Sequence, residues 1–209
     1  MFGEKMAEKN IFPSLRREIK ILHKILKIEG CIHFTDIIMD ENSLSIVFPY
    51  YINGDLYKYS NPVHKPVEES VAQRVCFQLA STLMQLHKEG IIHRGLKTEN
   101  ILVGFNWKVY LADFGFAIYE KELKKENQYA RVGTLEFYPI EMLSPCFRKD
   151  KITYDHRVDI WSMGIIIYEL LYGRTPFYTG NEVDTKARIR SLKFTFPNKR
   201  PSNNTSTLY

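Results

Sequence analysis

The sequence has few cysteines among its 209 residues, and they form no recognisable pattern. Cys31, Cys76 and Cys146 are widely spaced and include no C-x-x-C pair, which argues against a disulfide framework or a zinc site and for free thiols in a reducing compartment. The N-terminal MFGEKMAEKN lacks the apolar run of a signal peptide. The most apolar segment, 159–173, contains Glu169 and is too short to span a bilayer. We therefore expect an intracellular protein, cytoplasmic or nuclear, with no membrane partner.

A strong excess of one charge is also missing. The formal net charge is +5, and the 29 Lys and Arg residues are interspersed with 24 Asp and Glu residues. This pattern favours an ordinary solvated surface over a nucleic-acid-binding patch, so we expect no nucleic-acid partner. A hydrophobic content of 44% and an aromatic content of 13% favour a buried core and argue against wholesale disorder.

Hydrophobic periodicity predicts a helix, two strands and a mostly helical remainder. The first helix is expected over 14–29, with Ser14 as its N-cap and Gly30 as its stop. Strands are expected within 31–39 and 43–51, joined by a short turn. The remaining predictions are a long helix over 67–89, short strands at 101–103 and 107–112, a polar loop at 119–131, a buried helix at 158–172 and a short helix within 186–197. Together these elements predict an α+β fold.

Four short strings follow the long helix in a specific order. They are HRGLKTEN, ADFGFA, VGTLEFYPIEM and RVDIWSMG. Each string alone is weak evidence, but four in this order and spacing are specific. They resemble the eukaryotic protein kinase domain, and LRREIKI, VGTLEFYPIEM and FTFP resemble its Aurora-type serine/threonine branch. The resemblance runs from about Phe12 to Pro197.

The resemblance implies a two-lobed fold and a division of the chain. Residues 1–197 would form a partial kinase domain, in which 1–51 are a residual small lobe with helix C and two strands. Residues 52–197 would form the mostly helical large lobe. Residues 198–209 are polar and patternless, and we expect them to be a disordered or non-native tail.

The same resemblance implies a site for ATP and Mg²⁺. Asn100 and Asp113 would each hold a Mg²⁺ ion through an oxygen atom, and Lys97 would steady the γ-phosphate. The implied nucleotide-binding residues are Phe48 as gatekeeper, Pro49, Tyr50 and Tyr51 as the hinge, Asp55 at the ribose and Leu102 beneath the adenine.

Further residues are implied to be structural or regulatory. Glu18 would pair with a lysine of the third strand, although a solvated glutamate is the alternative. His93 would support the Asp-Phe-Gly turn, and Arg94 would grip a phosphorylated residue of the activation loop. The remaining positions are Ala130, where Aurora-type kinases carry the activating threonine, Thr134 facing the substrate, Glu141 within reach of Arg200, and Asp159 tying the buried helix to the catalytic loop.

Several departures from the family pattern oppose efficient catalysis. Gly95 stands where the family has the aspartate that acts as general base, a contribution of roughly 10²–10⁴ in rate. Aligned on LRRE, Met1 falls two residues beyond the expected third-strand lysine, and no glycine-rich loop is present. The family's final helices are missing after Pro197.

Three interpretations therefore remain open. The favoured one is a catalytically impaired kinase-family member, either a pseudokinase or a truncated kinase, with weak and metal-dependent nucleotide binding. The second is an active Aurora-like kinase whose sequence record is truncated or carries an error at Gly95. The third is a non-catalytic docking or scaffold module. The sequence indicates neither the substrate nor the protein partner.

Overall fold

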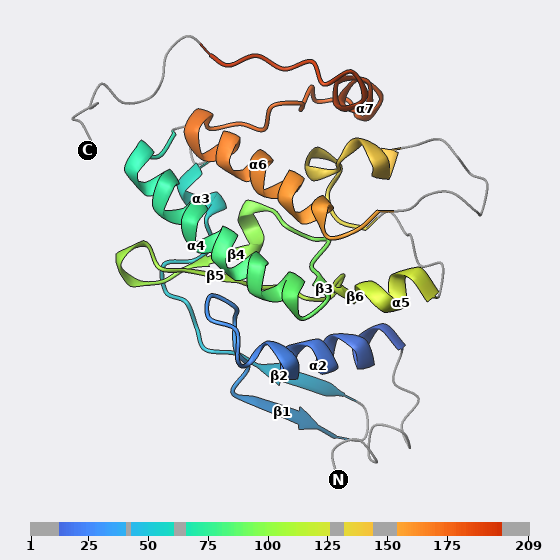
Figure 1. Ribbon diagram of the computed structural model, residues 1–209. Coiled ribbons are helices and arrows are strands. Elements are labelled where there is room, and N and C mark those ends of the chain that lie inside the picture. The colour runs from blue at the N-terminus through green and yellow to red at the C-terminus, as the bar shows by residue number, and fades with distance from the viewer. Residues whose placement is uncertain (1–12, 41–42, 61–65, 126–131, 144–153, 198–209) are drawn as a thin grey trace.

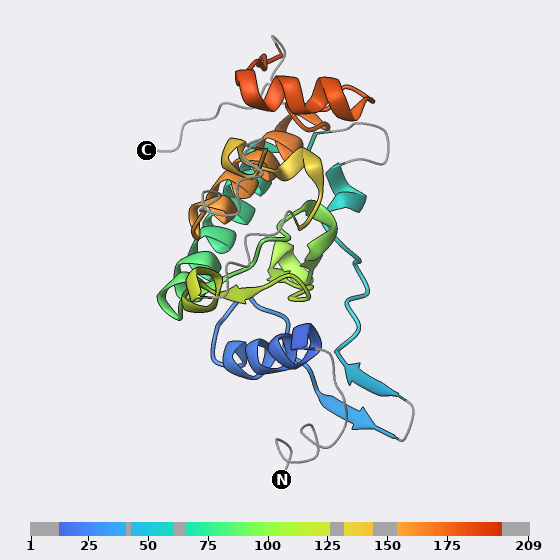
Figure 2. The same ribbon diagram turned by 90° about the vertical axis from the view of Figure 1, so that its right-hand side faces the viewer.

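The computed structural model describes residues 13–40, 43–60, 66–125, 132–143 and 154–197. A helix and two strands form a small part at one end, and a larger, mainly helical part follows (Figure 1). Figure 2 shows the two strands of the small part at one end and helix α7 (Glu182–Ser191) at the other. The predicted α+β layout is confirmed.

The small part consists of helix α2 (Pro13–Ile25) and strands β1 (Asp36–Met39) and β2 (Leu44–Val47). The strands pair antiparallel, with Asp36 opposite Val47 and Met39 opposite Leu44. The two predicted strands are confirmed, although both are shorter than the apolar segments that suggested them. The apolar face of α2 is buried and comprises Ile19, Ile21, Leu22 and Ile25.

The predicted end of this helix at Gly30 is wrong. Helix α2 ends at Ile25, and the chain turns before Gly30, which has φ +84°. A Cβ atom at Gly30 would overlap the hydroxyl of Thr82, which donates to the carbonyl of Glu29 at 3.3 Å. Glycine is required here because the turn passes directly against helix α4, in a conformation that other residues adopt at a cost.

Two helices form the centre of the larger part. Helix α4 (Glu69–Lys88) packs against helix α6 (Arg157–Tyr172), and the short helix α3 (Tyr57–Ser60) also contacts α6. The apolar periodicity predicts that the inner face of α4 comprises Val71, Val75, Leu79, Leu83 and Leu86. All of these are buried except Val71, which is half-buried. Gly173 ends α6 in the left-handed conformation (φ 69°). None of the described helices combines the length and the apolar character needed to cross a membrane.

Short antiparallel strand pairs lie between the small part and these helices. Strand β3 (Ile91–Ile92) pairs with β6 (Ile118–Tyr119), and β4 (Ile101–Val103) pairs with β5 (Val109–Leu111). A parallel bridge between Cys31 and Leu111 connects this layer to the small part. The described residues also include four 3₁₀ turns: η1 (Thr98–Asn100), η2 (Phe105–Trp107), η3 (Leu135–Phe137) and η4 (Ile140–Leu143), of which η3 and η4 contact α7.

Part of the predicted polar loop is helical. Helix α5 (Glu120–Lys125) occupies the first half of 119–131. Its Leu123 is fully buried in a cluster with Ile92, Ile118, Met142, Tyr154 and Val158. Glu122 forms an ion pair with Arg17 of α2, at 3.3 Å between Arg17 Nε and a carboxylate oxygen. The segment EKELKK has a single apolar residue, Leu123, which creates no periodicity, so the sequence could not indicate this helix.

The last helix, α7 (Glu182–Ser191), begins four residues before the predicted segment. Its N-cap is Asn181, whose side-chain oxygen accepts the backbone N–H groups of Val183 at 2.8 Å and Asp184 at 3.2 Å. No regular secondary structure follows it between 193 and 197, where an extended piece was expected.

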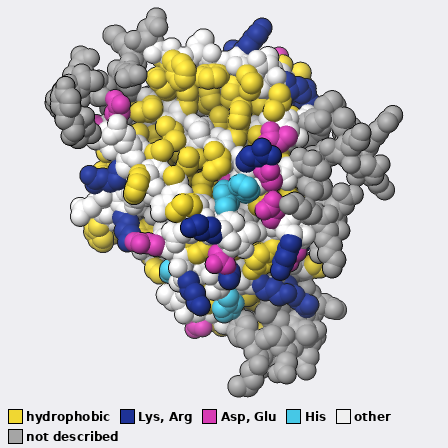
Figure 3. Space-filling model, viewed as in Figure 1, with side chains coloured by type: hydrophobic (Ala, Val, Ile, Leu, Met, Phe, Trp, Pro, Cys, Tyr) yellow, Lys and Arg dark blue, Asp and Glu magenta, His cyan; other side chains and the backbone are white. Residues whose placement is uncertain are grey.

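An apolar groove of about 690 Å³ runs along α6. Figure 3 shows hydrophobic side chains gathered in the upper part of the molecule, where α6 lies in Figure 1. Ile160, Tyr168, Phe194 and Phe196 line the groove, with Glu141 and Arg157 among its few charged residues. Exposed apolar grooves of this kind often mark sites of contact with another chain.

Candidate functional site

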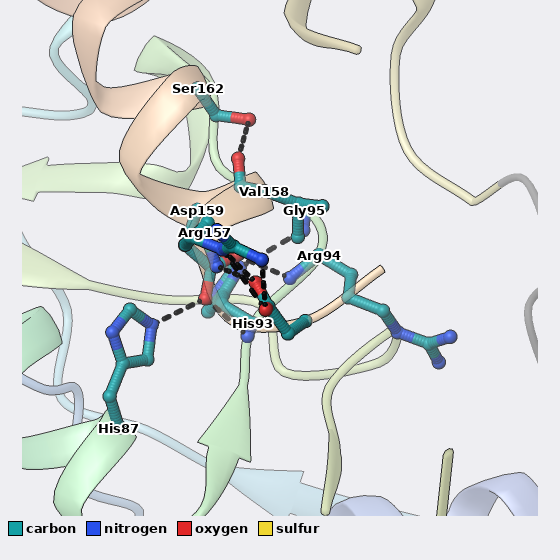
Figure 4. Close-up of polar contacts among 9 residues, drawn as sticks. His87, His93, Arg94, Gly95, Arg157, Val158, Asp159 and Ser162 are labelled. Atoms are coloured by element: carbon teal, nitrogen blue, oxygen red, sulfur yellow. Dashed lines mark hydrogen bonds and ion pairs between the residues drawn. The ribbon is translucent and has the colours of Figure 1, made fainter. Parts of the chain in front are cut away.

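One buried carboxylate organises the segment 93–95. Asp159, on the first turn of α6, is 1% exposed. One of its oxygens accepts the backbone N–H of Arg94 at 2.9 Å, and the other accepts that of His93 at 2.9 Å and contacts His87 Nε2 at 2.9 Å (Figure 4). Because hydrogen bonds to a charged group are strong, Asp159 fixes this loop to the helix.

His93 connects the same loop to the segment that follows strand β5. The N–H of Gly95 donates to His93 Nδ1 at 3.2 Å, so His93 Nε2 carries the proton and donates to the carbonyl of Ala112 at 3.1 Å. Burial lowers the pKa of His93, although the charge of Asp159 acts in the opposite direction. The ring also meets Phe114 edge-on, with 4.9 Å between centroids. His93 is therefore a neutral connector.

Asn100 and Asp113 present oxygen atoms from adjacent segments. The side-chain nitrogen of Asn100 donates to the Gly95 carbonyl at 2.8 Å. The backbone carbonyl of Asn100 accepts the N–H of Ala112 at 2.8 Å. Asp113 is exposed and has φ 61°, and its carboxylate accepts the N–H of Gly115 at 3.3 Å. The Asn100 amide oxygen and the Asp113 carboxylate suit Mg²⁺, which uses few protein ligands together with water and phosphate. Accordingly, the described residues contain no cluster of three or more His, Cys, Asp or Glu side chains that could hold a metal.

Glu18 lies beside the segment 113–115. Its carboxylate approaches Gly115, and burial and the charge of Asp113 both raise the pKa of Glu18. Glu18 is thus half-buried, whereas the alternative interpretation made it a solvated glutamate. Within the described ranges it forms no ion pair. Lys97 lies 3.7 Å from a carboxylate oxygen of Glu99.

Position 95 has room for a side chain but provides no functional group. Gly95 is buried, and a Cβ atom there would lie 3.5 Å from Phe116 and 3.6 Å from His93, which are ordinary van der Waals distances. The nearest acidic residue in the sequence, Glu99, contacts the Thr98 hydroxyl at 3.3 Å and Lys97. The Thr98 hydroxyl has one proton and lies closer to Glu169, at 3.1 Å, so Lys97 is the main partner of the Glu99 carboxylate.

The predicted nucleotide-binding residues divide into two groups. Phe48, Tyr51 and Leu102 are half-buried and pack against the main core, whereas Pro49 and Tyr50 are exposed. Asp55 and Leu102 are brought together by an antiparallel bridge. The Asp55 carboxylate accepts the N–H of Lys58 at 3.1 Å and therefore stabilises the start of α3.

The side chain of Arg94, which was predicted to bind a phosphorylated residue of the activation loop, contacts other groups of the protein in this structure. It adopts φ 62°, its Nε donates to the carbonyl of Phe116 at 2.8 Å, and its Nη1 donates to the Tyr154 hydroxyl at 3.0 Å. Figure 4 shows its guanidinium directed away from Asp159. Ala130, at the predicted site of the activating residue, lies outside the described residues, as does Arg200, the predicted partner of Glu141.

An acidic pocket of about 260 Å³ lies close to this loop and was missed by the sequence analysis. Glu99, Glu136 and Glu169 contribute to its lining, together with Thr134. Thr98 donates to Glu169 at 3.1 Å, and burial raises the pKa of Glu169 to about 7. The three acids come from η1, η3 and α6, so only the fold brings them together. Two of them lie inside the recognised strings, which is the one signal that could have identified them.

Comparisons with known proteins identify the family. The family model described as the protein kinase domain matches residues 3–208. Aurora kinase C of Mus musculus is 28% identical over 97% of the chain and 69% of its own length. Aurora kinases of Candida glabrata and Saccharomyces cerevisiae are 34% and 32% identical over 90% and 94% of the chain. The chain spans about half the length of these two relatives, 50% and 51%. The chain belongs to the protein kinase family and has an Aurora-type kinase domain.

Proposed function

We propose that this chain binds ATP with Mg²⁺ and a basic peptide, and that it transfers phosphate only slowly. The observation that carries the proposal is Gly95, a buried position without a carboxylate in the loop that Asp159 and His93 hold in place. The loop is well ordered by these contacts, so the missing group, rather than a collapsed loop, is the reason for impaired catalysis.

The missing carboxylate removes one defined contribution. In a phosphoryl-transfer site, an aspartate at this position orients the incoming hydroxyl group and accepts its proton. Glycine does neither, and general base catalysis contributes roughly 10²–10⁴ in rate. Glu99 is a poor substitute, because its carboxylate pairs with Lys97 and lines the acidic pocket.

Nucleotide binding rests on the oxygen atoms that remain. The Asn100 amide oxygen and the Asp113 carboxylate would hold Mg²⁺, and the bound ion would neutralise charge on the phosphates. Asn100 is oriented for this by its bond to the Gly95 carbonyl. Glu18 opposes binding to some extent, because its negative charge lies next to that of Asp113.

The acidic pocket supports a basic peptide as the second ligand. Glu99, Glu136 and Glu169 line one small cavity in which Arg174 is the one cation among the described residues, and a guanidinium or ammonium group of a ligand would compensate the remaining negative charge. A cation would also favour the ionised form of Glu169, whose pKa burial raises to about 7. A lysine or arginine of a protein substrate fits this chemistry.

A second candidate function is a non-catalytic docking module. The apolar groove along α6 favours this function, because a groove with a volume of about 690 Å³ and a lining of aromatic side chains is suited to a partner chain. This function requires peptide or protein binding but no nucleotide.

The two candidates are separated by measuring nucleotide binding and transfer on the same samples. Calorimetric titration with ATP, with and without Mg²⁺, should give Mg²⁺-dependent binding for the wild type and for Asp184→Ala, which removes an exposed carboxylate on α7. Asp113→Ala should abolish this binding. Radiolabelled γ-phosphate transfer to an arginine-rich peptide should be slow for the wild type and only slightly above that of Asp113→Ala. Transfer by the wild type several hundredfold above that control would refute slow catalysis. Peptide binding without any nucleotide binding would favour the docking module.

A further inference from the structure

A basic pocket of about 510 Å³ adjoins the acidic pocket. Its cations are Arg174, in the loop after α6, Arg188, on the last turns of α7, and Lys193, just beyond that helix. No acidic side chain lines the pocket. All three cations are exposed, and none forms an ion pair with another described residue. Three positive charges from separate segments thus face this cavity, and one of them, Arg174, also lines the adjoining acidic pocket.

The backbone holds two of these cations together. Leu192 adopts φ 52° and reverses the chain after α7, and the N–H of Lys193 then donates to the carbonyl of Arg188 at 3.2 Å. This reversal places both residues at the wall of the same pocket, where a bound anion would interact favourably with each of them.

Stabilisation of the helix end explains only part of this arrangement. Cations in the last turn of a helix interact favourably with its dipole, which accounts for Arg188. The neighbouring Arg190 is different, because it donates to the carbonyl of Leu143 at 3.0 Å. Neither Arg174 nor Lys193 lies within α7, so the helix dipole does not explain why they face the same cavity.

The other walls provide aromatic surface and hydroxyl groups. Tyr168 and Tyr178 line the pocket, and Tyr168 donates its hydroxyl to the carbonyl of Thr195 at 2.7 Å. Burial raises the pKa of Tyr168, while nearby Arg174 lowers it. A tetrahedral oxyanion with several acceptor oxygens would match two guanidinium groups and one ammonium group.

We propose that the basic pocket binds a phosphoryl group on a serine or threonine of a peptide. A phosphomonoester carries nearly two negative charges at neutral pH and three strong acceptor oxygens, so it compensates the three cations better than a carboxylate does. The peptide source follows from the position of the pocket: Arg174, Thr175 and Tyr178 line both this pocket and the acidic one. A ligand that fills both needs a cation and an anion close together along one chain, and a basic phosphopeptide has both. This choice of ligand, unlike the anion site itself, rests on the peptide-binding role proposed above.

The test is fluorescence anisotropy with labelled arginine-containing peptides, in which the arginines lie at varied distances from a phosphoserine. Each peptide is paired with its unphosphorylated form, and inorganic phosphate serves as a competitor. The full chain is compared with Arg188→Gln, Lys193→Gln and the control Lys88→Gln, which removes an exposed cation of α4. All changes are at exposed positions, and thermal unfolding verifies that each variant folds.

The expected result is that at least one phosphopeptide binds about tenfold more tightly than its serine form, because several charge-assisted bonds depend on the phosphate. Arg188→Gln and Lys193→Gln should remove most of this difference, and Lys88→Gln should preserve it. Equal affinity for both peptide forms, or an equal effect of Lys88→Gln, would overturn the proposal. Binding to phosphoinositide vesicles without phosphopeptide binding would overturn the peptide source.

The role of the acidic pocket is examined separately with Glu136→Gln. This change should weaken binding of the phosphorylated and the serine peptide alike, since it acts on the arginines. Phosphate-dependent binding that is unaffected by Glu136→Gln would retain the anion site and reject the basic-peptide role. If a variant of the basic pocket unfolds, phosphate-induced thermal stabilisation of the wild type and the remaining single variants provides the same comparison. No stabilisation of the wild type would contradict the site.

Discussion

The Asp159 carboxylate accepts the backbone N–H of Arg94 at 2.9 Å, from a buried position on the first turn of α6. Arg94 adopts a left-handed backbone conformation (φ 62°), which is unfavourable for residues that have a Cβ atom. The bond therefore maintains a strained loop conformation next to Gly95. Strain of this kind persists only where surrounding contacts over-determine it.

Replacing Asp159 with asparagine should strongly destabilise the fold. An asparagine amide has one acceptor oxygen, so its nitrogen would face an N–H donor and leave a buried polar group unsatisfied. We expect a loss of about 3 kcal/mol in the free energy of unfolding. Chemical denaturation measures it, with the exposed Asp184→Asn as control. Similar transition midpoints for both variants would show that the Asp159 contacts contribute little.

Removing the Tyr154 hydroxyl should loosen Arg94. Tyr154→Phe eliminates the acceptor of the 3.0 Å bond from Arg94 Nη1 but keeps the ring in its buried cluster. We expect a loss of about 1–2 kcal/mol, together with faster amide hydrogen exchange in α5, whose Leu123 packs in that cluster. The exposed Tyr50→Phe should change neither quantity. Unchanged exchange in Tyr154→Phe would contradict this anchoring role.

Glu169 should make stability depend on pH between about 4.5 and 7. Burial raises its pKa from the ordinary 4.5 to about 7, so the folded state binds its proton more tightly than the unfolded chain does. The folded state therefore loses stability as pH rises through this window, by at most about 3 kcal/mol, and the penalty is absent below it.

Glu169→Gln should remove this pH dependence, because glutamine does not titrate and can still accept the Thr98 hydroxyl. The difference in unfolding free energy between variant and wild type should favour the variant increasingly from pH 5 to pH 8. Glu68→Gln, at an exposed position, should follow the wild type throughout. A constant difference across this range would mean that Glu169 titrates normally.

Gly95→Asp alone should not produce an active kinase. A Cβ atom at this position would meet Phe116 and His93 only at ordinary van der Waals distances, so we expect the variant to fold. However, no cation pairs with Glu18 in the described part of the chain, and Glu18 instead adds negative charge beside Asp113. Alignment of the phosphates, on which phosphoryl transfer chiefly depends, would still be poor. Transfer equal to that of Gly95→Asp/Asp113→Ala is expected. Transfer well above that double variant would show that the base is the single deficit.

The order of short motifs was sufficient to predict the family and the α+β layout. Family membership was a strong inference because HRGLKTEN, ADFGFA and RVDIWSMG occur in a specific order and spacing, and the structure brings Asp159, His93 and Asn100 into one network through Gly95. Helices α4 and α6 were equally predictable, since each is long and its apolar residues identify the buried face.

The sequence by itself determined which chemical groups the chain carries: a glycine at 95, carboxylates at 18 and 113, and three cations near its end. Only the tertiary structure decided which of them meet. Helix α5 exists because Leu123 fits a cluster built from distant segments, and Glu169 has a raised pKa because α6 buries it. The acidic and basic pockets share Arg174, Thr175 and Tyr178, which lie in the loop between α6 and α7. Local patterns encode periodicity and turns, whereas burial and the convergence of like charges depend on contacts between residues far apart in the sequence.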